Sequence, residues 1–241
     1  MQLPTITNKQ KEILLLLYRF RFLNRIQIQK LLNHKSPKNI NVWLKDLTTK
    51  NYTGRIFEKK LGVNDPAIYF VSTNGIKFLK SLDDYNNEYL KRFYQEVRRS
   101  KQFINENVMI GDIFLILSAK NFAGFKFYTR SDFPIKGLIR NLLPNFAYIY
   151  EKNGKVKYYA YEILKDGMPR FAIRSRIEKY IDFFSLNSNS EVNIIFICAN
   201  ESMARYVLKF SEEIIDIDKQ VQITCSTLLI SQLVTNFQQE V

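Results

Sequence analysis

Apolar residues in the first 50 positions recur at the three-to-four-residue spacing of helices. The spacing predicts helices over residues 8–20, 25–32 and 37–50. Each predicted helix is preceded by a residue type that caps helix N-termini, and two of the caps have Gln three positions later, as in a capping box. These caps are Thr7 with Gln10, Asn24 with Gln27, and Ser36 followed by Pro37.

A hairpin pattern follows the third predicted helix. Residues 53–60 and 67–72 are predicted strands on either side of a turn at 62–66, and a further helix is predicted over 75–82. Three helices followed by a hairpin are typical of a winged helix. The alternative is a small helical domain with a hairpin that has no binding role.

The rest of the chain changes from helical to mixed periodicity. Helices are predicted between 88 and 120, over 168–184, 201–210 and 227–237, and strands over 125–130, 145–151, 156–164, 192–199 and 221–224. This order predicts an antiparallel hairpin, with its turn at Asn153-Gly154, that feeds a parallel pair through a helix. The predicted fold class is therefore α+β / α/β.

A polar, acidic stretch at 83–88 indicates a domain boundary. We expect an N-terminal domain at residues 1–82, a linker helix at 83–102 and an α/β domain at 103–241. The linker helix carries several basic residues, which either cross a phosphate backbone or form an ordinary solvated face.

The positive charge gathers in the N-terminal domain. The chain has a formal net charge of +13, and residues 1–82 hold 15 basic and 4 acidic residues, a net charge of +11. Such asymmetry favours a polyanionic partner, DNA above all, over a merely lysine-rich surface. The third helix turns Ile40, Trp43, Leu44 and Leu47 inward, so its outer side and the hairpin supply the candidate DNA-binding residues. These are Lys38, Asn39, Asn41, Val42, Lys45, Arg55, Lys59 and Lys60.

Other chemistries are disfavoured by what the chain lacks. The apolar runs are shorter than the roughly 20 residues of a membrane span, and we expect no signal peptide. Two separated cysteines, Cys198 and Cys225, and a single histidine, His34, predict neither a disulfide framework, a zinc site nor a catalytic triad. We expect a cytoplasmic protein without a cofactor or resident metal.

Two short segments resemble motifs of one protein family. The first is the strand-to-helix turn Val71-Ser72-Thr73-Asn74-Gly75. The second is the pair Pro144-Asn145 and Tyr161-Glu162-Ile163-Leu164-Lys165-Asp166-Gly167. They are similar to the Leu-Thr-Pro-x-Gly turn and to the Pro-Asp, hairpin, Glu-x-Asp-x-Gly pattern of the replication-relaxation family of plasmid and mobile-element proteins. The resemblance runs from about residue 7 to residue 225.

The resemblance implies a three-layer restriction-endonuclease-like α/β domain behind the winged helix. In such a nuclease Asn145, Glu162 and Lys165 would be the site residues, with Mg²⁺ held by carboxylates. Asn145 is neutral where the family has Asp, and Leu164 stands where it often has an acid. Asp166, Asp112 or Glu106 could replace the missing acid. The simpler interpretation places Glu162 at a sheet edge, neutralised by Lys165 or Arg174, and we expect no catalysis.

The leading hypothesis is a double-stranded DNA-binding protein of replication, copy control or mobilisation in a plasmid or phage-like element, which does not cut DNA. The resemblance leaves open a relaxase or replication initiator as a partner, and a homodimer. The alternatives are a winged-helix transcriptional regulator and a metal-dependent DNA nuclease.

Overall fold

The structure of the chain is a computed structural model. It describes residues 3–57, 65–82, 85, 87–132, 144–152, 154–187, 192–215 and 223–229. The chain divides into two compact units, Met1–Leu115 and Ile116–Val241.

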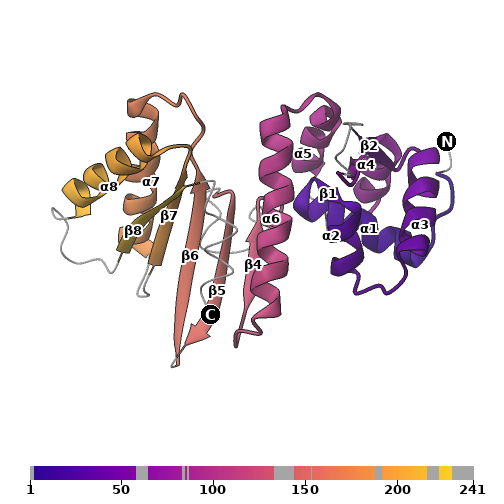
Figure 1. The fold of residues 1–241 in the computed structure, drawn as a ribbon, viewed down its shortest axis with the longest axis horizontal. Helices are drawn as coiled ribbons and strands as arrows, with labels where there is room; N and C mark the ends of the chain where they lie inside the picture. Colours follow the sequence, from indigo (N-terminus) through magenta and orange to yellow (C-terminus); the bar gives the residue numbers. More distant parts are fainter. Residues whose placement is uncertain are drawn as a thin grey trace. The chain divides into compact units, whose positions relative to one another are not determined.

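The first unit begins with three helices and a small sheet (Figure 1). In chain order its elements are α1 (Asn8–Phe20), β1 (Leu23–Asn24), α2 (Arg25–Leu31), α3 (Pro37–Thr49), β2 (Thr53–Ile56), β3 (Ile68–Val71), α4 (Thr73–Lys80), α5 (Asn87–Leu90), the 3₁₀ helix η1 (Lys91–Arg98) and most of α6 (Lys101–Ala119). The strands form an antiparallel sheet in the order β1-β3-β2. The expected helices over 8–20, 25–32 and 37–50 are thus confirmed to within one residue at each end.

Local side-chain bonds explain why these helices begin where they do. Both predicted capping boxes are present, because the Thr7 and Asn24 side chains each accept from the amide three residues on, and the Gln at that position bonds back. Ser36 caps α3 by accepting from the Asn39 amide at 3.4 Å. The inner sides of α1 and α3 then bury Ile13, Leu14, Leu17, Ile40, Leu44 and Leu47 completely.

The residues expected to form a linker helix, 83–102, belong to the first unit instead. Tyr18 of α1 lies in a cluster of rings with Tyr85, Tyr89 and Phe93, at centroid distances of 4.8, 5.9 and 5.6 Å. Glu96 is fully buried and forms an ion pair with Arg21. Aromatic residues recur every four positions in this segment, and burial of their rings attaches it to α1. The segment is therefore not the separate linker that the polar stretch predicted.

The start of α6 also packs on the first unit. Gln27 donates to the Val108 carbonyl at 2.7 Å and to Asp112 Oδ1 at 2.8 Å. Gly111 permits this approach, because a Cβ there would lie 2.8 Å from a methyl group of Leu23. The boundary between the units consequently falls inside α6.

The described strands of the second unit form a mixed five-stranded sheet. The elements of this unit are β4 (Lys126–Thr129), β5 (Phe146–Lys152), β6 (Lys155–Ile163), α7 (Arg170–Asn187), β7 (Val192–Cys198), α8 (Glu201–Ile215) and β8 (Ile223–Leu229). The strand order is β4-β5-β6-β7-β8, with antiparallel pairing up to β6 and parallel pairing from β6 to β8. The predicted hairpin that feeds a parallel pair through a helix is confirmed.

The C-terminal prediction is wrong in part. Thr227–Leu229 were expected to start a helix, but they continue β8, which pairs with β7 along seven residues. A complete partner strand overrides the helical pattern there. The rest of that predicted helix, 230–237, lies outside the described residues.

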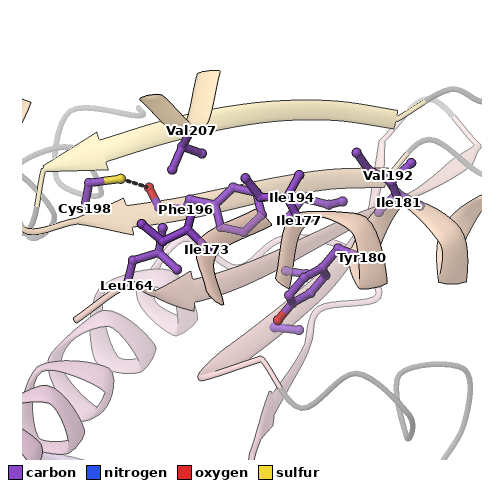
Figure 2. Close-up of a cluster of buried hydrophobic side chains, with 12 residues drawn as sticks. Leu164, Ile173, Ile177, Tyr180, Ile181, Val192, Ile194, Phe196, Cys198 and Val207 are labelled. Carbon is purple, nitrogen blue, oxygen red and sulfur yellow. Dashed lines mark hydrogen bonds between the residues drawn. The ribbon is translucent and has the colours of Figure 1, made fainter. Parts of the chain in front are cut away.

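Helices α7 and α8 cover one face of the sheet (Figure 1). Figure 2 shows the core between them, where Ile173, Ile177 and Tyr180 of α7 meet Ile194 and Phe196 of β7. Ile177, Ile194 and Phe196 are completely buried. Alternation along β6 and β7 places Ala160, Glu162, Ile194 and Phe196 on this face. Glu162 therefore faces α7.

Candidate nucleic-acid interface

One side of α3 is buried and the other carries the predicted DNA-binding residues. Apolar residues at 40, 44 and 47 hold the helix in the core, which turns the intervening positions outward. The helix residues named from the sequence are all exposed, and Val42 keeps 57% of its surface. They are Lys38, Asn39, Asn41, Val42 and Lys45.

Strand β2 adds a further predicted residue beside α3. Arg55 is exposed, and its guanidinium lies 4.7 Å from the centre of the half-exposed Phe57 ring. Lys59 and Lys60, the other hairpin residues predicted to bind DNA, lie outside the described residues.

Asn41, Lys45 and Arg55 meet at one groove of about 400 Å³. Its lining is Asn41, Leu44, Lys45, Thr48 and Thr49 from α3, Arg55 from β2 and Tyr69 from β3. These residues supply two cations, an amide and three hydroxyls, and no carboxylate. The groove can therefore hold an anion beside a surface that donates and accepts hydrogen bonds.

Thr48 and Tyr69 are groove residues that the sequence analysis missed. The Thr48 hydroxyl donates to the Leu44 carbonyl at 2.8 Å and lies 3.1 Å from the Thr53 hydroxyl, which joins α3 to the start of β2. Helical spacing puts Thr48 beside Leu44 and Lys45, and this signal was available. The place of Tyr69 depends on its pairing with Arg55 across β2 and β3, which the sequence does not specify.

The acid on α3 is neutralised on another side of the helix. Asp46 accepts from Lys50 and from Gln10, both at 2.7 Å. Both bonds lower the pKa of Asp46, and the bond from Lys50 has the larger effect. Asp46 lines a separate cavity of about 490 Å³ together with Val42 and Trp43.

The second candidate site surrounds Glu162 in the second unit. Glu162 is 1% exposed and accepts from Arg176, and from the Tyr180 hydroxyl at 3.0 Å. Burial raises the pKa of Tyr180, against the opposing effect of Arg130 and Arg176 nearby, so its phenol donates. The carboxylate is neutralised by a guanidinium and bonded by a phenol.

The expected environment of Glu162 is wrong in two respects. Strand β6 is the middle strand of the sheet, not an edge. The counter-charge is Arg176. Arg174 lies about 160° from Arg176 around the axis of α7, and it donates to the Tyr206 hydroxyl at 2.7 Å. Arg176 and Tyr180 are four residues apart, which puts both on the side of α7 that faces the sheet.

Asn145 and Glu162 are brought together, but Lys165 is not. Asn145 Oδ1 accepts from the amide of Ile163 at 2.9 Å, directly after Glu162. Lys165 is exposed beyond the end of β6, and Asp166 is exposed in the following turn. Leu164 is buried in the core.

The remaining substitute acids are engaged elsewhere or differently placed. Asp112 accepts from Gln27 in the first unit, and Glu106 is buried in that unit. Within the described ranges, no three His, Cys, Asp or Glu residues form a group that could hold a metal ion. The residues around Glu162 do not fit the Mg²⁺ of a nuclease, since one carboxylate is present and Arg176 already neutralises it.

No protein-family model matches the chain, and no curated protein matches it. Two solved structures are similar to it: restriction endonuclease FokI bound to DNA, and restriction endonuclease FokI. The first has 12% identity and a TM-score of 0.34, and the match covers 95% of this chain and 44% of that one. The second has 10% identity and the same TM-score, with 98% and 45% covered. The chain thus spans under half the length of FokI, and so low a TM-score establishes neither a common fold nor an activity.

Across the part of the chain that the structure describes, no helix combines the length and hydropathy required to cross a bilayer.

Proposed function

We propose that the protein binds double-stranded DNA through α3 and the β2–β3 hairpin, which act as the recognition helix and wing of a winged helix. The observation that carries the proposal is the single groove lined by Asn41, Lys45 and Arg55. Lys45 of α3 and Arg55 of β2, 10 residues apart in sequence, converge there with hydrogen-bonding groups of both elements.

The position of α3 suits a recognition helix. Its buried side is entirely apolar, while its outer side carries two lysines and two asparagines with 57%-exposed Val42 between them. Asn pairs with adenine in the major groove, Lys bonds guanine or phosphate, and an apolar group such as that of Val42 can contact the thymine methyl. A short turn joins α2 to α3, as in helix-turn-helix proteins.

The charge distribution supports the same conclusion. Residues 1–82 carry nearly all of the net charge, and the groove lining contains no acid. Neutralised phosphates release counterions, so affinity for any duplex should fall steeply with salt.

The second unit is proposed to bind or assemble rather than cut. The buried Glu162 already has a cationic partner in Arg176, and Asn145 supplies no charge. A divalent ion would have to displace the guanidinium from a site with one carboxylate. The setting in a plasmid or phage-like element follows from the resemblance to the replication-relaxation family, with a relaxase or replication initiator as the protein partner it suggests.

The test is a footprint of the full chain on DNA that flanks its own gene. Protection near an origin or transfer region is the expected result. Protection confined to a promoter would replace this setting with transcriptional regulation, and no protection on any duplex would refute the DNA-binding proposal.

A parallel assay tests the absence of cleavage. Supercoiled plasmid is incubated with wild type and Glu162→Gln in Mg²⁺ or Mn²⁺. We expect no nicking by either. Metal-dependent nicking by wild type that disappears in Glu162→Gln would establish a nuclease.

A further inference from the structure

Arginines and aromatic rings alternate on the outer side of α7 and α8. The Arg170 guanidinium lies 5.0 Å from the centre of the Tyr206 ring. The Arg174 guanidinium lies 4.7 Å from that of Phe210, and its Nε donates to the Tyr206 hydroxyl at 2.7 Å. Tyr206 and Phe210 are parallel, with centroids 6.4 Å apart. The rings thus hold both guanidiniums in fixed orientations.

Phe171 projects from the same part of α7. It is 75% exposed, the largest fraction among the exposed large apolar side chains described. It follows Arg170 directly and precedes Arg174 by three residues, so cations lie on both sides of it along the helix. An exposed aromatic ring on the same two turns of helix as two oriented guanidiniums indicates a binding surface. We call Arg170, Phe171, Arg174, Tyr206 and Phe210 the α7–α8 face.

Further positive charge borders the α7–α8 face. Arg205 and Lys209 are exposed on α8 and directly precede Tyr206 and Phe210. The Arg205 side chain lies 4.0 Å from that of Glu201. Because these side chains are 77% and 76% exposed, solvent screens the pair, and Arg205 can readily bind another anion instead. The surface is therefore complementary to a negatively charged ligand.

We propose that the α7–α8 face binds single-stranded nucleic acid, with a base stacked on Phe171 and phosphates bonded by Arg170 and Arg174. Each nucleotide offers both groups that this face needs, a flat ring and a phosphate. Bases within an intact duplex are already stacked on their neighbours, and freeing one costs unstacking energy, so a single strand is the form that offers a base to Phe171 most readily. This surface is separate from the α3–β2 groove, and the proposal does not depend on the function proposed for that groove.

The test measures binding of the full chain to a labelled oligothymidylate of about 20 nucleotides, longer than a typical single-strand site. The Phe171→Ala variant removes the stacking ring. Because the Phe171 side chain is largely in solvent, its removal should leave the fold intact. The expected result is about tenfold weaker binding to the oligonucleotide, the lower part of the range for one stacked base, with duplex binding unchanged. A 2-aminopurine in the strand should lose its stacking signal in the variant.

The matched control is Lys152→Ala/Lys155→Ala, which removes two exposed charges at the β5–β6 turn of the same unit. Arg170→Ala/Arg174→Ala removes the same number of charges from the α7–α8 face and should weaken binding far more. Equal losses in the two double variants, or wild-type affinity in Phe171→Ala, would overturn the proposal. No binding of the oligonucleotide, with Phe171-dependent binding of a labelled Glu- and Phe-rich peptide, would overturn it in favour of an acidic protein partner.

Discussion

Replacing Arg176 with Ala tests whether a guanidinium is the resident cation beside Glu162. The substitution leaves a carboxylate that is 1% exposed with the Tyr180 hydroxyl as its remaining described bond. Breaking a fully buried pair costs about 3–5 kcal/mol. The Arg176 side chain is 43% exposed, so solvent screens the pair and water can reach the vacated space. We therefore expect a loss of about 2 kcal/mol in the free energy of unfolding.

Thermal unfolding followed by circular dichroism measures this loss. For a chain of this size, about 2 kcal/mol corresponds to a Tm decrease of roughly 4–8 °C. Arg205→Ala is the matched control, because it removes an arginine from a pair that is exposed on both sides. It should change the free energy of unfolding by less than about 0.5 kcal/mol.

A double variant separates the charge from the packing. Glu162→Gln in the Arg176→Ala background removes the unpaired charge and should recover part of the lost stability. A Tm for Arg176→Ala within about 1 °C of wild type would refute the reasoning. A double variant less stable than Arg176→Ala would refute it as well.

Three further outcomes follow from other contacts. Bonds from Lys50 and Gln10 lower the pKa of Asp46 in the folded protein. The stability that Asp46 contributes is therefore present above its unfolded pKa of 3.8 and is lost as pH falls through the lower folded pKa. Asp46→Asn should flatten the acid side of the curve of unfolding free energy against pH, and an unchanged curve would contradict this. Burial raises the pKa of the Cys198 thiol to about 11, so native Cys198 should react with iodoacetamide at pH 8 much more slowly than after denaturation, as peptide mass mapping can measure. Arg55→Ala should lower the salt slope of duplex binding by about one unit, and a slope equal to that of wild type would place Arg55 away from phosphate.

Local signals predicted the helices of the first unit. Thr7 and Asn24 form capping boxes with residues three positions away, so both ends of the interaction lie within one turn of sequence. Strands β5, β6 and β7 were predicted for the same reason, since the local pattern of apolar residues and turns needs no distant partner.

Features that depend on tertiary pairing were not predicted. The ion pair between Arg21 and Glu96 joins residues 75 positions apart, and it helps attach to α1 a segment that looked like a linker. The partner of Glu162 was assigned to Arg174, because the sequence does not show which side of α7 faces the sheet. The groove between α3 and β2 requires the register of Arg55 with Tyr69, whereas the exposed residues of α3 follow from helical spacing alone.

Sequence discrimination by Asn41→Ala/Lys45→Ala shows whether α3 and β2 form a DNA-reading surface. The reference is Asn8→Ala/Lys11→Ala, which removes the same two residue types from an exposed side of α1. The measurement compares affinity for the footprinted duplex with affinity for a scrambled duplex at fixed salt. We expect this ratio to fall at least about tenfold in the α3 variant, at about 1–3 kcal/mol for each lost base contact, and to keep its wild-type value in the α1 variant. An unchanged ratio in Asn41→Ala/Lys45→Ala, or an equal loss in both variants, would contradict this expectation.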